Sequence, residues 1–223
     1  MPEPLAQVVR AAEGYVDALL QKVGLELPGG SSAPAARADT ADVTEALALL
    51  ERIPVRVEQP RGYDREAWAH WLGEDGDCQD ARQEVLAAES LEPVRWDVEG
   101  CDVTVGLWRD AYTGETYRDP QALEVDHVVP LAEAHRSGGR DWTPGQRAAF
   151  ANDLGDPRSL VAVSASANRS KGDQGPEEWL PSDPAARCGY VAIWVAVKVH
   201  WSLAMDERER INVGNLLRAC AEN

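Results

Sequence analysis

Two short segments with reactive side chains constrain this chain more than any other feature of its sequence. The segments are Glu124-Val125-Asp126-His127-Val128-Val129-Pro130 and Ser166-Ala167-Asn168-Arg169-Ser170-Lys171-Gly172-Asp173. The apolar residues around the first predict a strand from Leu123 to Leu131, and the run from Leu160 to Val163 predicts a second strand. We therefore expect the order strand, strand, and then a helix or turn that has Asn168 at its start.

These two segments resemble the HNH, or ββα-metal, nuclease signature, which implies that Asp126, His127 and Asn168 form an active site. A carboxylate and an amide oxygen suit a hard divalent cation such as Mg²⁺ or Mn²⁺, so Asp126 and Asn168 are candidate metal ligands. An imidazole of roughly neutral pKa can take a proton from water, so His127 is the candidate general base. Successive side chains of a strand point to opposite sides, unless a twist at the strand end brings both toward one phosphate. The sequence leaves both geometries open.

The residues around this group carry further expectations. Glu124 shares a strand face with Asp126, so it is either a further metal ligand or an exposed strand carboxylate. Lys171 is a candidate catalytic residue that contacts the scissile phosphate or its neighbour. Arg169 and Arg147 are candidate substrate contacts, with a solvated Arg169 as the alternative. Asp173 is expected to cap a turn.

The resemblance to the HNH signature extends beyond these residues. Glu124-x-Asp126-His127-x-x-Pro130 with Asn168-x-x-Lys171 is similar to the HNH domain of RNA-guided CRISPR effector nucleases, where the matching Asp and Asn hold the metal and the matching His is the general base. A longer match, which includes Gly62-Tyr63-Asp64-Arg65 and Tyr112-Thr113-Gly114, resembles actinobacterial HNH-family proteins, many of which look secreted. A related module forms the C-terminal part of the GmrSD-type modification-dependent restriction enzymes. Nucleases of this group often have Asn, which supports the loop of the catalytic His, where this chain has Ser159.

The resemblance implies an α+β fold, with a ββα-metal core embedded in a mostly helical domain that has a few short antiparallel strands. It also implies a metal-dependent endonuclease that hydrolyses phosphodiester bonds of DNA and leaves 5′ phosphate ends. Two alternatives stay open. One is a partner-dependent or non-catalytic binding module on the HNH scaffold. The other is the nuclease subunit of a restriction or defence assembly, in which a second subunit recognises DNA.

The net charge limits how this chain can bind nucleic acid. It has 38 acidic and 22 basic residues and a formal charge of −16, whereas phosphate affinity usually comes from Lys and Arg. The stretch from Glu124 to Asp173 is nearly neutral, because six basic residues stand against seven acidic ones. The charge therefore counts against a tight DNA-coating role, and we expect weak, salt-sensitive binding without strong sequence specificity.

The four cysteines, Cys78, Cys101, Cys188 and Cys220, favour disulfides over a zinc site, because no C-x-x-C spacing occurs. The pairs Cys78–Cys101 and Cys188–Cys220 would each staple a local unit and are the favoured connectivity. Buried free thiols that fill core space are the alternative.

The chain divides into three predicted parts. Residues 1–27 form an amphipathic helix, because apolar residues recur at three- and four-residue spacing from Leu5 to Val23. Residues 28–40 form a flexible linker rich in Pro, Gly and Ser, and residues 41–223 form the HNH domain. The helix either docks on the core or binds a partner or a second copy.

The sequence also bears on location. No apolar stretch approaches the roughly 20 residues of a membrane span. The start Met1-Pro2-Glu3-Pro4 lacks the basic and apolar parts of a signal peptide. We expect a cytoplasmic protein as the sequence stands, or a secreted one if a leader was removed.

Periodicity and capping signals predict the remaining elements. Thr143 and Gln146 form a capping box for a helix that ends near Ala151. Trp68, Trp71, Trp142, Trp179, Trp194, Trp201 and His200 are expected in the core, and His135 either approaches the site or is solvated. Helices are expected over 44–52, 65–72, 80–88 and 184–199 and after Asp206, with strands within 94–108 and a turn over 110–114.

Overall fold

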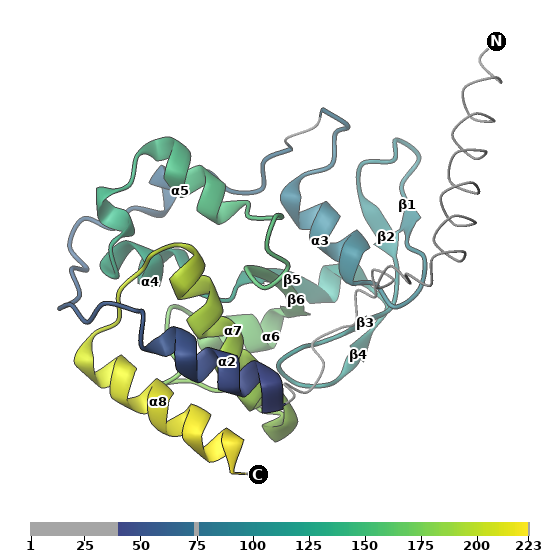
Figure 1. Ribbon diagram of the computed structural model, residues 1–223. Helices are drawn as coiled ribbons and strands as arrows, with labels where there is room; N and C mark the ends of the chain where they lie inside the picture. Colours follow the sequence, from purple (N-terminus) through teal and green to yellow (C-terminus); the bar gives the residue numbers. More distant parts are fainter. Residues whose placement is uncertain (1–39, 74–75, 223) are drawn as a thin grey trace, which may run out of the picture. The chain divides into compact units, whose positions relative to one another are not determined.

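Residues 40–73 and 76–222 are described by a computed structural model (Figure 1). In this part of the chain seven α-helices accompany three two-stranded antiparallel sheets, so the fold class is α+β. The predicted helix over residues 1–27 and nearly all of the predicted linker over 28–40 lie outside the described residues. Among the helices of the described part, none combines the length and the hydropathy that crossing a membrane requires.

The two motif segments lie on adjacent elements. Strand β5 (Leu123–His127) pairs antiparallel with β6 (Leu160–Ser164), and helix α6 (Ala165–Lys171) follows directly. The pairing places Asp126 opposite Val161. The order strand, strand, helix is therefore as predicted, although Asn168 lies in the middle of α6 and not at its start. The helix begins earlier because the Ser164 hydroxyl accepts a hydrogen bond from the Ala167 N–H and caps it.

Strand β5 ends earlier than the predicted Leu131. The Val128 N–H still bonds to the Ser159 carbonyl, but Pro130 then becomes the N-cap of α4 (Leu131–Arg136), a helix that the sequence did not predict. Pro has no N–H for a sheet ladder and suits a helix start, so the chain changes element at this residue.

Two apolar clusters hold the elements in place. The larger lies among α2 (Thr40–Leu50), α7 (Arg187–His200) and α8 (Glu207–Ala221), which lie side by side in Figure 1. The smaller lies where α3 (Ala81–Glu89) packs on β5 and β6. It contains Leu123, Val125, Leu160 and Ala162, which occupy alternate strand positions as half-buried strands require.

Two short hairpins adjoin the smaller cluster. Strand β1 (Arg95–Trp96) pairs with β2 (Val103–Val105), and β3 (Trp108–Arg109) pairs with β4 (Thr116–Tyr117). The buried Trp108 donates its indole N–H to the Leu86 carbonyl at 2.7 Å, which ties the second hairpin to α3. The predicted strands within 94–108 are thus confirmed, as is the turn that follows at Asp110–Gly114.

Both predicted disulfides are present. Cys78–Cys101 joins the segment before α3 to the β1–β2 hairpin, and Cys188–Cys220 joins the start of α7 to the end of α8. Each closes a loop of a few tens of residues, for which chain entropy predicts about 3–4 kcal/mol of stabilisation. The favoured pairing is confirmed, and free thiols are excluded among these four residues.

The capping signals also located helices correctly. Helix α5 (Pro144–Ala151) begins with the predicted box of Thr143 and Gln146. Asp80 and Asp206 accept hydrogen bonds at the starts of α3 and α8. Asp183 caps the short 3₁₀ turn Pro184–Ala186, which leads directly into α7.

The predicted helix over 65–72 is wrong beyond its first turn. Only the 3₁₀ turn Arg65–Ala67 forms, and Trp71 has a φ of +58°, which does not occur within an α-helix. The backbone instead bonds to Asn152, whose side chain accepts from the Leu72 N–H and donates to the Ala69 carbonyl, both at 2.9 Å. These contacts to a distant residue replace the hydrogen bonds that a helix would make.

The positions of two histidines and of the tryptophans were also predicted. His200 is exposed at the end of α7, so its predicted core position is wrong. His135 is buried and packs edge-on against Tyr63, so it is not solvated. The tryptophans pack as expected: Trp68 and Trp194 are fully buried, and Trp71, Trp142, Trp179 and Trp201 pack partly buried against the two clusters.

Candidate functional site

The motif residues surround one cavity of about 420 Å³. Asp126 and His127 reach it from β5, and Asn168 and Arg169 reach it from α6. Tyr63 and Arg65, from the segment that precedes the motif, also line it. The fold therefore brings the two separate sequence segments together, and it adds a third segment that the motif analysis did not assign to the site.

Asp126 is held from two sides by buried hydrogen-bond donors. The Tyr112 hydroxyl donates to Oδ2 at 2.6 Å, and the Lys171 ammonium donates to Oδ1 at 3.1 Å and lies 2.8 Å from Oδ2. The same ammonium donates to the His127 carbonyl at 3.0 Å. Burial raises the pKa of Asp126, whereas Lys171 and Tyr112 act in the opposite direction and favour the carboxylate.

Lys171 does not reach the cavity in this conformation. Its side chain is completely buried, and its ammonium group is occupied by Asp126 and by backbone. Burial lowers the pKa of Lys171, and the adjacent carboxylate opposes that change. The geometry makes Lys171 a support beneath Asp126, and the predicted contact with a phosphate would require the side chain to move.

His127 is packed between aromatic rings. Its ring lies 5.5 Å from that of Trp71 and 6.3 Å from that of Phe150, measured between centroids. Nε2 bonds to the Ala151 carbonyl at 2.9 Å. A carbonyl oxygen only accepts hydrogen bonds, so Nε2 carries the proton and Nδ1 is the basic nitrogen. Burial lowers the pKa of His127 to about 3, so the ring is neutral near pH 7.

Glu124 connects the strand to the helix. Its carboxylate accepts from Asn168 Nδ2 at 2.8 Å and from Arg169 Nη2 at 2.9 Å. Because Asn168 is bonded through its amide nitrogen, its amide oxygen keeps its acceptor capacity. Glu124 is thus bonded to both Asn168 and Arg169 on α6, and it is not among the residues that line the cavity.

Two other predicted residues lie differently from expectation. Asp173 lines the cavity and pairs with Arg136 at 2.9 Å, so its carboxylate makes a tertiary ion pair and not a turn cap. Arg147 lies on α5 and is not among the residues that line the cavity.

The loop between β5 and β6 is anchored despite Ser159. The Ser159 hydroxyl donates to Asp153 Oδ2 at 2.7 Å, and the Trp201 indole N–H donates to the same atom at 2.9 Å. The Ser159 carbonyl accepts from the Val128 N–H, one residue after His127. These bonds fix the end of β5 without the Asn that related nucleases often have here.

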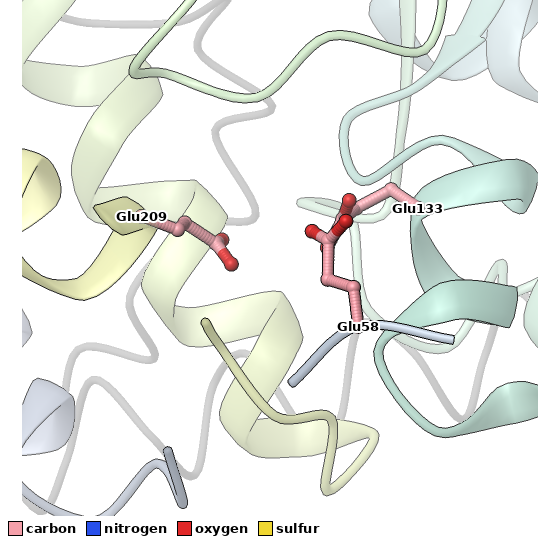
Figure 2. Close-up of side chains that lie close together, drawn as sticks. All are labelled: Glu58, Glu133 and Glu209. Atoms are coloured by element: carbon pink, nitrogen blue, oxygen red, sulfur yellow. The ribbon is translucent and has the colours of Figure 1, made fainter. Parts of the chain in front are cut away.

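An acidic group elsewhere offers a second location to test for a metal. Oxygens of Glu58, Glu133 and Glu209 lie within 4.8 Å of one another, and Figure 2 shows Glu209 facing the other two across a gap. The Lys198 ammonium donates to Glu133 Oε1 and Glu209 Oε2, both at 2.6 Å, and is completely buried. Lys198 therefore supplies the positive charge that a metal would bring, and the group is a structural ion cluster.

Several residues that contact the site are not predicted by the motif. Tyr112, Ala151 and Asn152 contact Asp126, His127 and the Trp71 segment respectively. Tyr63 and Tyr112 belong to the longer resemblance, which marks them as shared with the group but does not indicate that they fold onto one site. Their positions depend on contacts between residues far apart in the sequence.

Comparison with known proteins defines the family. Residues 80–212 match the C-terminal domain of GmrSD restriction endonucleases, and this range includes β5, β6 and α6. The chain is also 37% identical over 177 residues to a protein of Arthroderma benhamiae named "Uncharacterized secreted protein". That alignment covers 78% of this chain and 84% of the relative. No solved structure matches the chain significantly. The chain belongs to the GmrSD C-terminal domain family.

Proposed function

We propose that this protein is a metal-dependent HNH endonuclease that hydrolyses phosphodiester bonds of DNA, with β5, β6 and α6 as its ββα-metal core. The observation that carries the proposal is the convergence of Asp126, His127 and Asn168 on one cavity. These residues lie within the part of the chain that matches a restriction endonuclease domain. Family membership and local geometry therefore support the same reaction.

The donor set fits a hard divalent cation. Asp126 offers carboxylate oxygens and Asn168 an amide oxygen, and both residues line the cavity. Each carboxylate oxygen of Asp126 has two lone pairs, so its bonds to Tyr112 and Lys171 leave acceptor capacity. Mg²⁺ or Mn²⁺, when bound, would stabilise the charge that develops on the phosphate and on the leaving oxygen. Glu124 would contribute through its bond to Asn168 or through a metal-bound water.

His127 is the proposed general base. Nδ1 takes a proton from a water molecule whose oxygen attacks phosphorus, and the bond from phosphorus to the 3′ oxygen breaks. The products are a 5′ phosphate and, after proton uptake, a 3′ hydroxyl. The Ala151 carbonyl holds Nε2–H and so fixes the orientation of the ring. An anionic phosphate in the cavity would raise the pKa of His127 from about 3, because it stabilises the imidazolium.

Lys171 acts by positioning Asp126. Its buried ammonium favours the ionised carboxylate and fixes its orientation, together with the Tyr112 hydroxyl. Arg169 is exposed at the cavity and remains the candidate substrate contact of the motif, although Glu124 pairs with it in the unliganded protein. Arg147 would contact only a substrate that extends beyond the cavity.

The working environment that we propose is outside the cell. Two disulfides suit an oxidising compartment, and the relative from Arthroderma benhamiae is named as secreted. These observations favour the secreted alternative over the cytoplasmic one.

The net charge of −16 supports a second candidate function, a nuclease subunit whose partner recognises DNA. In that case the predicted helix over residues 1–27 would be the docking element. Deletion of residues 1–40 separates the two, because an autonomous enzyme keeps its activity and a docked subunit loses its partner.

The test is cleavage of supercoiled plasmid and of linear single-stranded DNA at low salt, in Mg²⁺, in Mn²⁺ or in EDTA. His127→Ala should lose metal-dependent cleavage by about 10²- to 10⁴-fold. His200→Ala, an exposed histidine at the end of α7, is the matched control and should cleave like the wild type. Circular dichroism checks the folding of both variants. Full cleavage by His127→Ala would overturn the assignment of the base.

A further inference from the structure

The charged side chains that line the cavity are unequally neutralised. Asp126 is paired with Lys171, Asp173 with Arg136, and Arg169 with Glu124. Arg65, which also lines the cavity, makes no ion pair with any carboxylate of residues 40–73 and 76–222. It is therefore the cavity's one uncompensated cation within the described part of the chain.

Local structure holds Arg65 at the cavity. It begins the 3₁₀ turn Arg65–Ala67, which Asp64 caps by accepting the Glu66 N–H at 3.0 Å. Trp68, at the end of this turn, is almost completely buried and anchors the segment to the core. The Tyr63 ring packs edge-on against buried His135 at 5.6 Å. Burial raises the pKa of the Tyr63 hydroxyl, and the charge of nearby Arg65 opposes that change. The Arg65 side chain is thus exposed, while the segment that carries it is held in place.

Arg65 shares the cavity with the proposed base. Arg65 and His127 both line it, so an anion that enters the cavity lies near a guanidinium and an imidazole. In a protein whose net charge is −16, such a local cation is needed to hold a polyanion near the site.

We propose that Arg65 binds the phosphate of a nucleic-acid substrate in the cavity and that Tyr63 positions its guanidinium. The inference rests on the proposed nuclease function and adds a substrate-binding residue that lies far before the motif in the sequence. A guanidinium suits this role because it presents parallel N–H donors that match two phosphate oxygens, whereas a lysine presents a single point charge.

The experiment measures binding separately from cleavage. The full chain is titrated against a fluorescein-labelled single-stranded DNA oligonucleotide in EDTA, and anisotropy is followed over a series of salt concentrations. Arg65→Ala is expected to weaken binding about tenfold at low salt. It is also expected to reduce the slope of log K against log salt by about 1. Arg65→Lys should recover part of the affinity, and Tyr63→Phe should show a smaller loss.

Arg61→Ala is the matched control. Arg61 is exposed on the same segment, carries the same charge and does not line the cavity. At about 0.15 M salt its substitution should leave the affinity within about twofold of the wild type, because a charge that does not contact the phosphate is largely screened at this ionic strength. Thermal unfolding of each variant shows whether the segment remains folded.

The outcomes separate this inference from the proposed function. Equal binding by Arg65→Ala and Arg61→Ala would overturn the role of Arg65, while plasmid cleavage by the wild type would still support a nuclease. A specific loss in Arg65→Ala without cleavage by the wild type would support the phosphate site and refute the nuclease. Absence of any DNA binding by the wild type at low salt would overturn the phosphate site as well.

Discussion

The Lys171 ammonium lies 2.8 Å from the Asp126 carboxylate, and both side chains are almost completely buried. A buried charge that loses its partner is strongly destabilising, because the desolvation cost is no longer offset. A motif lysine that sequence reasoning assigned to the substrate is therefore part of the protein's own interior.

Lys171→Met should lower the free energy of unfolding by about 3–5 kcal/mol, because it leaves the Asp126 carboxylate buried without a cation. Urea unfolding at pH 7 measures this change. Arg169→Met, two residues earlier on α6, removes an exposed pair with Glu124 and should cost less than about 1 kcal/mol. Equal stability of the two variants would contradict the structural role of Lys171.

Glu89 should make stability depend on pH. Its carboxylate accepts the Ala162 N–H at 2.9 Å, and burial raises its pKa from the ordinary 4.5 to about 7. A raised pKa means that the folded protein holds the proton more tightly, so this contribution is complete below pH 4.5 and is lost as the pH rises through 7.

Relative to Glu89→Gln, the wild type should therefore lose stability between pH 5 and pH 8, on the order of 1–3 kcal/mol. The difference in stability between the two proteins, followed across this pH range, measures this change. The lowered pKa of His127 has the opposite effect on stability, but it is common to both proteins and cancels in the difference. A difference that does not change with pH would show that Glu89 is ionised at all these values.

The disulfides should contribute separately to stability. Cys188→Ser with Cys220→Ser removes the link between α7 and α8 and should lower the free energy of unfolding by about 2–4 kcal/mol. Cys78→Ser with Cys101→Ser provides the comparison at the hairpin. If reduction of the wild type left its melting temperature unchanged, the stabilising role of both links would be refuted.

Lys198 should be as important for folding as Lys171. Lys198→Met leaves Glu133 and Glu209 buried with less positive charge and should cost several kcal/mol. Its effect on the melting temperature should be unchanged by added Mg²⁺ or Mn²⁺, because we assign a structural role to this cluster. A variant rescued by either metal would instead indicate an ion site.

Features that depend on neighbours along the chain could be predicted from the sequence. The capping box of Thr143 and Gln146, the helix caps at Asp80 and Asp206, and the order of β5, β6 and α6 follow from local hydrogen bonding and periodicity. The disulfide pairing was also predictable, because each link closes a short stretch of chain.

Contacts between residues far apart along the chain establish which of these residues share an environment. Hydrogen bonds that join Asn152 to Ala69 and Leu72 replace those of the helix predicted around Trp71. Lys171 is buried and pairs with Asp126. The packing of the segment before the motif brought Arg65 to the cavity. Such outcomes depend on hydrogen bonds and on the desolvation of charges between residues far apart in the sequence, which local patterns do not encode.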